Sequence, residues 1–237
     1  MAATDNTWEV LLHAPIEKME ENLWRVEGTL KGMALKRVMT VVRLGDGHLV
    51  IHNGIALDEE AMREIEEWGF PTVLIVPNGF HRLDAAAYKE RYPELRVLCP
   101  KGARKRVEQV VNVDGDYNDY EEQAFLTLEH LQGVSNAEGV MKVQSGSGTT
   151  LVFNDLIFNM PHGDGLAGFI FRYLAQSTGG PRVSRLARWL VVKDAPALRA
   201  HLERLADTEN LKRIIVSHHQ TIVHDAADVL RRVALTI

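Results

Sequence analysis

The stretch from Thr72 to Ala85 constrains the fold more than any other part of this sequence. An apolar run rich in β-branched residues ends at Pro77-Asn78-Gly79, and His81 and Asp84 follow directly. This pattern predicts a buried strand, a loop that carries polar side chains, and a helix that leaves the loop. In open α/β folds, ligands bind beyond the carboxyl ends of the strands. His81 and Asp84 are therefore the first candidate site residues.

The rest of the N-terminal half also favours strands and helices in alternation. The first fifty residues predict antiparallel strands, with Gly45-Asp46-Gly47 as a hairpin turn. A helix then begins after the N-cap Asp58 and is closed by Gly69. The predicted strands are Leu23 to Leu30, Arg37 to Leu44, His48 to His52, Thr72 to Val76 and Arg96 to Cys99, and the further helices are Leu83 to Arg91 and Ala103 to Gln109. Short connections between such elements favour βαβ units with right-handed crossovers.

The C-terminal half again favours strands and helices, after a surface loop predicted at Asn112 to Tyr120. Ser145-Gly-Ser-Gly148 lacks the Gly-Lys-Ser/Thr of a phosphate loop and no helix follows it, so a hairpin turn is favoured. Asp194 is the predicted N-cap of a helix with Pro196 in its first turn. The predicted strands are Glu138 to Gln144, Thr149 to Asn154 and Arg213 to Ser217, and the helices are Leu166 to Gln176, Val183 to Val191, Ala195 to Ala206 and Asp225 to Leu235.

These elements predict one domain, residues 1–237, of the α/β (α+β) class. Two mixed β-sheets with helices on the outer faces, an αββα sandwich, account for antiparallel strands followed by alternating strands and helices. A single Rossmann-like sheet is the alternative, but no Gly-x-Gly-x-x-Gly follows any predicted strand.

Composition limits the classes of function. The chain has 237 residues, 46% of them apolar, and a net charge of -5, which argues against a dedicated nucleic-acid binder. Its one cysteine, Cys99, suits a reducing compartment, and redox chemistry there lacks a second thiol. We expect no signal peptide and no membrane span, because the start has no basic and apolar regions and no apolar run approaches about 18 residues. A cytoplasmic protein is the resulting expectation.

Polar side chains gather where predicted strands end. They form four groups, which are His81 with Asp84, Asn154-Asp155, His218-His219 and His52-Asn53-Gly54. Imidazole and carboxylate are ligands that zinc, iron and manganese accept. If the strands are neighbours, these groups converge in one cleft.

The order of these motifs resembles the metallo-β-lactamase superfamily, and more narrowly a divergent branch known as a domain of unknown function with a degenerate metal-binding motif. The motifs are strand-His-Asn-Gly, strand-Pro-Asn-x-x-His, Tyr-Pro, strand-Cys-Pro-Lys-Gly, Thr-Thr-Leu-Val-Phe-Asn-Asp and Ile-Val-Ser-His. The resemblance extends from about Trp24 to the last residue. It implies the αββα sandwich, with a metal site between the two sheets.

The resemblance also assigns residues. The hydrolases of the superfamily carry a His-x-His-x-Asp-His loop, of which this chain keeps His81 and Asp84 in altered spacing. Asp155 resembles the family's bridging aspartate, and His218 resembles its last histidine. The middle histidine of the Gly-His-Thr-x-Gly pattern has no counterpart, and His52 replaces the acid of the early strand. The region where that histidine is expected holds only Gln132, Asn136 and Glu138, with His130 just upstream.

Losing about half of the ligands disfavours a two-metal centre. The implied site is mononuclear, with one divalent zinc, iron or manganese ion held by His81, Asp155 and His218. Asp84 is then the general base, or it orients a ligand imidazole. The reaction would be hydrolysis of a small ester, thioester or phosphoester.

The alternative is a metal-free, non-catalytic binding or scaffold domain on the same fold. Here His81, Asp155 and His218 only make hydrogen bonds, and Asp84 caps the following helix. We expect an unidentified small molecule as partner, and no nucleic acid or membrane. A homodimer is compatible with the sequence, which does not determine the oligomeric state.

Other polar and aromatic residues have structural explanations. His52 and His162 are expected to be hydrogen-bonded structural histidines, and Asp164 to stabilise a turn. Trp68 and Trp189, on helices, are expected in the core. The series Arg182, Arg185 and Arg188 predicts one helix face, either solvated and paired with acids or acting as an anion clamp.

Overall fold

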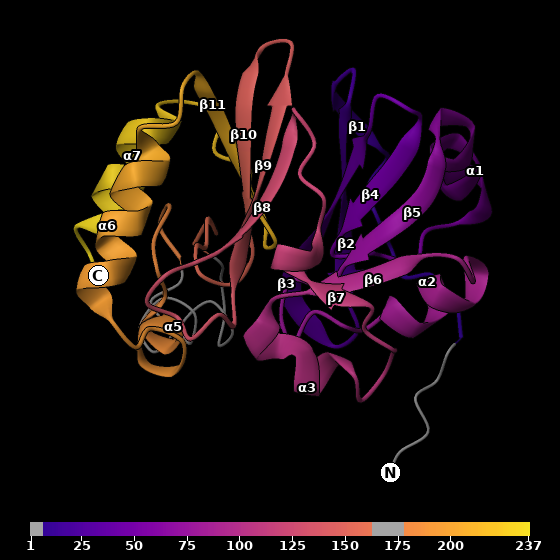
Figure 1. The fold of residues 1–237 in the computed structure, drawn as a ribbon, viewed down its shortest axis with the longest axis horizontal. Helices are drawn as coiled ribbons and strands as arrows, with labels where there is room; N and C mark the ends of the chain where they lie inside the picture. The colour runs from indigo at the N-terminus through magenta and orange to yellow at the C-terminus, as the bar shows by residue number, and fades with distance from the viewer. Residues whose placement is uncertain (1–6, 163–177) are drawn as a thin grey trace. The chain divides into compact units, whose positions relative to one another are not determined.

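The computed structural model describes residues 7–162 and 178–237, which form a mixed α/β protein with two mixed sheets and helices. The chain divides into two compact units, Met1–Glu121 and Glu122–Ile237. Figure 1 labels the elements of both units. Within the described ranges, no helix has both the length and the apolar character needed to cross a bilayer. The single-domain interpretation stays a prediction, and each unit is described by itself below.

Unit 1 is built on a sheet in which each strand pairs with its neighbour in the sequence. Its seven described strands are β1 (Glu17–Glu20), β2 (Leu23–Leu30), β3 (Met33–Arg43), β4 (His48–His52), β5 (Phe70–Ile75), β6 (Arg96–Cys99) and β7 (Gly115–Asp116). The pairs from β1 to β4 are antiparallel, and those from β4 to β7 are parallel. The predicted change from hairpins to βαβ units is therefore confirmed.

The helix α1 (Glu59–Trp68) begins and ends at the predicted residues. The Asp58 carboxylate accepts a hydrogen bond from the Ala61 N–H at 2.9 Å, as an N-cap does. Gly69 follows the helix with extended backbone, since its φ is 178°. A Cβ at this position would lie 2.3 Å from the Gly47 carbonyl oxygen. Close approach of two backbone segments thus requires glycine here.

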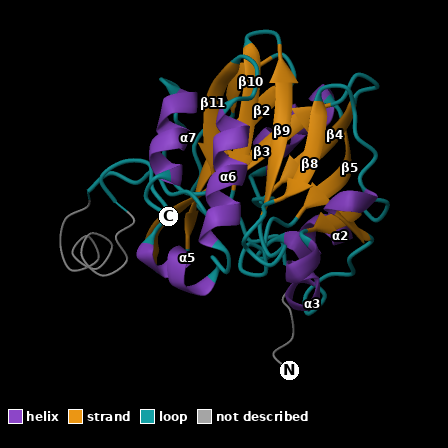
Figure 2. Ribbon diagram, turned by 60° about the vertical axis from the view of Figure 1, so that its left-hand side comes forward, coloured by secondary structure: helices purple, strands orange, loops and turns teal. Residues whose placement is uncertain are grey.

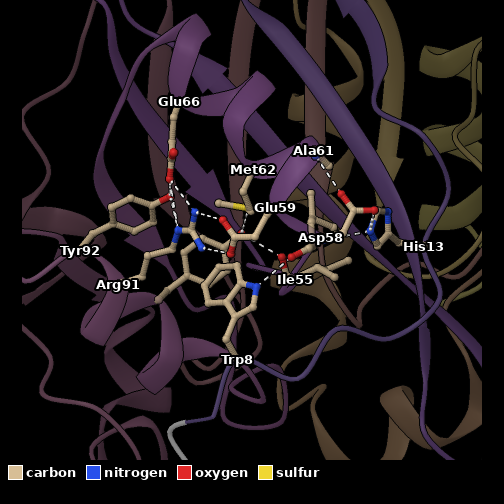
Figure 3. A network of polar contacts seen from close by, with 12 residues as sticks. Trp8, His13, Ile55, Asp58, Glu59, Ala61, Met62, Glu66, Arg91 and Tyr92 are labelled. Carbon is tan, nitrogen blue, oxygen red and sulfur yellow. Dashed lines mark hydrogen bonds and ion pairs between the residues drawn. The ribbon is translucent and has the colours of Figure 1, made fainter.

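Two more helices, α2 (Ala85–Arg91) and α3 (Arg104–Val107), complete unit 1. A network of polar contacts joins α2 to α1 (Figure 3). Arg91 makes ion pairs with Glu59 at 2.7 Å and Glu66 at 3.0 Å, and it lies over the Trp8 ring. The Trp8 indole N–H donates to the Leu57 carbonyl at 2.8 Å. This network ties the N-terminal segment to both helices.

The segment from Asn112 to Tyr120 is more than the surface loop that was predicted. It contains β7 and a 3-10 turn, η2 (Tyr117–Asp119), and both of its tyrosines are buried. The Asp116 and Asp119 side chains form a reciprocal capping box around η2. The acidic composition of this segment therefore obscured a short strand and a 3-10 turn that is capped by carboxylates.

Unit 2 contains a sheet of four described strands in the order β11-β10-β9-β8. They are β8 (Leu126–His130), β9 (Gly139–Ser145), β10 (Gly148–Phe153) and β11 (Leu211–Val216). The predicted hairpin is confirmed, because β9 and β10 pair antiparallel with Ser145 opposite Gly148. The strand β8, which pairs with β9, was not predicted.

The helices α6 (Ala195–Ala206) and α7 (Ala226–Ala234) pack together along the sheet of unit 2 (Figures 1 and 2). The bounds of α6 and its Asp194 cap are as predicted, with an N–H donated by Ala197 at 3.0 Å. Apolar residues of both helices form one core with β10 and β11. The predicted helix at Leu166 to Gln176 and the predicted turn at Asp164 lie outside the described residues.

Two predictions around α5 (Arg185–Leu190) are wrong. The helix begins only after its Ser184 cap, so Arg182 is not on the same helix face as Arg185 and Arg188. Arg182 instead forms an isolated bridge with Phe158. Trp189 is 77% exposed and is not a core residue. Trp68, in contrast, stacks on Trp24 at 3.8 Å between ring centroids, as expected for a packed aromatic residue.

Candidate metal centre

Asp155 and His218 come together at the ends of two adjacent parallel strands. The strands β10 and β11 pair in register up to Phe153 and Val216. The chain continues from each of them into a polar group, so the two groups emerge at the same edge of the sheet. The His218 Nε2 atom lies 2.9 Å from the Asp155 Oδ1 atom. The predicted meeting of these residues is present, and metal binding by them stays a prediction.

The surroundings hold the His218 ring in place. His218 is 4% exposed, and its ring stacks on Phe158 at 5.4 Å with an interplanar angle of 10°. The next residue, His219, has the left-handed φ of 66°, and it forms a parallel bridge with Asn159. The backbone of His218 is therefore held by β11 before it and by the bridge between His219 and Asn159 after it.

His81 lies in a loop between β5 and α2 that is also well anchored. The Asn78 side-chain oxygen accepts hydrogen bonds from the N–H groups of Phe80, at 2.8 Å, and His81, at 3.0 Å. The Arg82 guanidinium donates to the Arg106 carbonyl and to Gln109. The half-buried His81 ring contacts Asn53, with 3.0 Å between Nδ1 and Oδ1. The loop thus presents His81 from a fixed backbone.

Asp84 follows in the same loop and forms a buried ion pair. Its Oδ2 atom lies 2.5 Å from the Arg37 Nη1 atom and accepts the Ala56 N–H at 3.1 Å. Both side chains of the ion pair are buried. Asp84 stands at the N-cap position of α2 but makes no side-chain capping bond, so the capping alternative is wrong. These contacts do not test the predicted catalytic role of Asp84.

His52 ends β4 in a fully buried position. It pairs in register with Thr40 of β3, and among the described residues neither its Nδ1 atom nor the Thr40 hydroxyl has a hydrogen-bond partner. Burial, and secondarily the electrostatic interaction with the His81 ring, lowers the pKa of His52 to about 3. The imidazole is therefore neutral at physiological pH.

The remaining candidates have structural roles or low reactivity. The His162 Nδ1 atom lies 3.0 Å from the Thr178 hydroxyl, and its ring packs tightly against Gly179. Cys99 is buried, and burial raises the pKa of its thiol to about 12, which disfavours the reactive thiolate.

Sequence reasoning missed two residues that contact the loop of His81 and Asp84. Arg37 was named only as the first residue of a predicted strand, although strand alternation places this charged residue on one face with Met39 and Val41, which was a usable signal. Asn53 was noticed only as part of a polar group. Its contact with His81 depends on tertiary structure, and no local pattern predicts it.

Comparison with known proteins supports the fold. No protein-family model and no curated protein matches the chain. Among solved structures, DIM-1 metallo-beta-lactamase exposed to ceftazidime has a TM-score of 0.63 and 12% identity, covering 96% of this chain and 99% of that chain. The metallo-beta-lactamase from Erythrobacter litoralis has a TM-score of 0.63 and 14% identity, covering 94% of this chain and 96% of that chain. The enzyme from Hirschia baltica has a TM-score of 0.59 and 14% identity, covering 93% and 98%.

Identities this low establish a shared fold rather than a shared activity. The chain has the fold of the metallo-β-lactamase superfamily, and the predicted αββα fold class is confirmed.

Proposed function

We propose that this protein is a metal-dependent hydrolase with a mononuclear site formed by His81, Asp155 and His218. The observation that carries the proposal is the contact between His218 and Asp155 at the edge of the unit 2 sheet. A buried imidazole and a carboxylate at the ends of adjacent parallel strands are a ligand pair on a rigid support.

The donor set fits a divalent ion. Ligand atoms about 2.0–2.1 Å from zinc in a tetrahedron lie roughly 3.3 Å from each other. The 2.9 Å separation of the His218 and Asp155 donor atoms needs only a small increase to reach that value. Two imidazoles and one carboxylate also leave a coordination position for water, which is typical of catalytic sites. Zinc, iron and manganese all accept these ligands.

His81 is proposed as the third ligand. It follows β5, a central strand of its sheet, in a loop whose backbone is held by Asn78. The resemblance of the motif order to the metallo-β-lactamase superfamily motivates this choice of ligand. The proposal therefore unites residues from the two units.

The chemistry would be hydrolysis of a small ester, thioester or phosphoester. A bound divalent ion lowers the pKa of its water ligand toward neutrality and polarises the scissile group. His81, Asp155 and His218 would hold the ion. We assign to Asp84 the positioning role rather than that of general base, because Arg37 already compensates its charge. Through Arg37 and the Ala56 N–H, Asp84 fixes the end of the loop that carries His81.

One observation favours the second candidate, a metal-free binding or scaffold domain. His218 and His81 each have a hydrogen-bonding side-chain partner, Asp155 and Asn53, so neither imidazole requires a metal to be satisfied. The two candidates differ in their response to metal ions and chelators.

The deciding experiment is metal content by elemental mass spectrometry on untagged protein purified without chelator. We expect about one equivalent of zinc, iron or manganese in the wild type and its loss in His218→Ala. His219→Asn is the matched control, because asparagine tolerates the left-handed backbone at this position and the neighbouring ligand is retained. Circular dichroism must show that both variants are folded.

Absence of metal from the wild type, even after incubation with each ion, would reject the hydrolase and favour the scaffold. Equal metal in the wild type and His218→Ala would reject the ligand set. Near-stoichiometric metal that disappears only in His218→Ala supports the site and justifies a screen of ester, thioester and phosphoester substrates.

A further inference from the structure

Asn53 has an unusual backbone and a buried side chain beside His81. It follows β4 with the left-handed φ of 59° and is almost completely buried. Its N–H donates to the Ile75 carbonyl, at the end of β5, at 3.0 Å. Asparagine is among the residues that tolerate this backbone region, so its presence has a structural cause. The contacts of its side chain also define the orientation of the amide group.

The orientation of the Asn53 amide is determined by its neighbours. The Nδ2 group donates to the Val38 carbonyl at 2.8 Å. A backbone carbonyl only accepts hydrogen bonds, so the amide end that faces Val38 must be the nitrogen. The other end, which lies 3.0 Å from the His81 Nδ1 atom, is therefore the oxygen.

The same logic assigns the tautomer of a neutral His81 ring. An amide oxygen cannot donate, so the Nδ1 atom of the neutral imidazole must carry the hydrogen. The lone pair of the ring then resides on Nε2. A metal-binding histidine is commonly oriented in this way by a hydrogen-bond acceptor on its other nitrogen.

We propose that Asn53 is a positioning residue that fixes His81 as the Nδ1–H tautomer and presents its Nε2 atom to a divalent cation. This assignment rests on the proposed metal site. Asn53 achieves it through contacts to three strands, since Val38 lies in β3, Asn53 follows β4 and Ile75 ends β5. The tautomer is thus set by the folded sheet before any ion binds.

Two variants separate the side chain from the backbone. Asn53→Gly keeps the left-handed conformation and removes the amide. Asn53→Asp restores an acceptor for the His81 Nδ1–H, although it loses the donor to Val38. Asn210→Gly is the control, because Asn210 has a similar φ of 50° in unit 2.

The first measurement is the 15N chemical shifts of the His81 ring in metal-free protein, at a pH where the imidazole is neutral. We expect protonated Nδ1 and unprotonated Nε2 in the wild type, a mixture of tautomers in Asn53→Gly, and a return to Nδ1–H in Asn53→Asp. A wild-type ring protonated on Nε2, or an unchanged ring in Asn53→Gly, overturns the inference. This readout is independent of whether metal binds.

The second measurement is the zinc affinity of the same proteins by competition with a chromophoric chelator. We expect affinity to fall about 10- to 100-fold in Asn53→Gly, to recover substantially in Asn53→Asp, and to stay at the wild-type level in Asn210→Gly. Unchanged affinity in Asn53→Gly overturns the positioning role. If the wild type binds no metal, the proposed function fails and the presentation of Nε2 to a cation fails with it, while the ring shifts still report what Asn53 does to His81.

Discussion

His52 shows how a single buried residue couples stability to pH. Its pKa is about 3 in the folded protein, against an ordinary value of 6.5, because burial disfavours the charged ring. Between these two pH values the unfolded chain binds a proton that the folded protein does not. Stability must therefore fall as the pH falls through this window.

We expect His52 to contribute a loss of about 1.4 kcal/mol in the free energy of unfolding for each pH unit below 6.5, continuing toward pH 3. Urea unfolding of metal-free protein at several pH values measures this slope. Carboxylates also titrate in this range, so the comparison is with His52→Gln, which should have a shallower slope. Parallel curves for the two proteins would show that folding does not lower the pKa of His52.

The buried pair of Arg37 and Asp84 gives a second prediction at this scale. Asp84→Asn leaves the guanidinium buried without a counter-charge, and we expect a loss of about 3–5 kcal/mol in the free energy of unfolding. Arg37→Met combined with Asp84→Leu should recover most of that loss, because no buried charge remains.

The control is Arg231→Ala, which breaks exposed, solvent-screened pairs with Asp207 and Asp228 and should leave the free energy of unfolding almost unchanged. Denaturant midpoints measure all of these variants. If Asp84→Asn is as mild as Arg231→Ala, the ion pair does not hold the His81 loop.

At the scale of elements, the end of α1 depends on contact between two backbone segments. Gly69→Ala would place a methyl group 2.3 Å from the Gly47 oxygen and 2.7 Å from the Leu49 side chain. We expect a cost of about 1–3 kcal/mol, since the backbone must shift to relieve the overlap. Gly146→Ala, in the hairpin turn, has open space around its Cβ and should change stability by no more than about 0.5 kcal/mol. Similar thermal unfolding midpoints for the two variants would refute this explanation.

Elements with strong local signals were predictable from the sequence. The strands β2, β4 and β6 and the helix α6 have the predicted bounds, because alternation, caps and turn residues agree there. The strand β8 was missed because Leu126 and Leu128 are its only buried residues, too few for a period. β7 has only two residues and depends on its neighbour β6. Trp189 was misplaced because its side chain is large and apolar, yet it lies exposed on a short helix.

At the scale of the whole molecule, the proposed site would couple the two units through a shared ion. A ligand that binds only the folded protein stabilises it, by about 2.7 kcal/mol at 100 times its dissociation constant. We expect added zinc to slow amide hydrogen exchange both at residues 78–84 and at residues 154–156 and 217–219, and a chelator to reverse this. Protection confined to the second group would show that His81 is not a ligand.

Only part of the candidate site was predictable from the sequence, because some of its contacts depend on how distant segments of the chain pack together. Asp155 and His218 could be paired because each follows an apolar strand, and parallel neighbours end at one edge. The partners of the other two candidates could not be predicted. Asn53 contacts His81 and Arg37 contacts Asp84 across 28 and 47 residues of sequence, through strand adjacency that local patterns do not encode.

The strand order of the two sheets implies a sequence of events during synthesis. In unit 1 every strand pairs with the one made just before it, so pairing can follow the chain as it leaves the ribosome. In unit 2, β10 can complete its pairing only after β11 has been synthesised. Asp155 and His218, which then come into contact, are 63 residues apart in the sequence. Long-range parallel pairing is slow, because the loop must close before any contact forms. We therefore expect nascent chains halted before β11 to carry an ordered first sheet and an unpaired, aggregation-prone β10 edge.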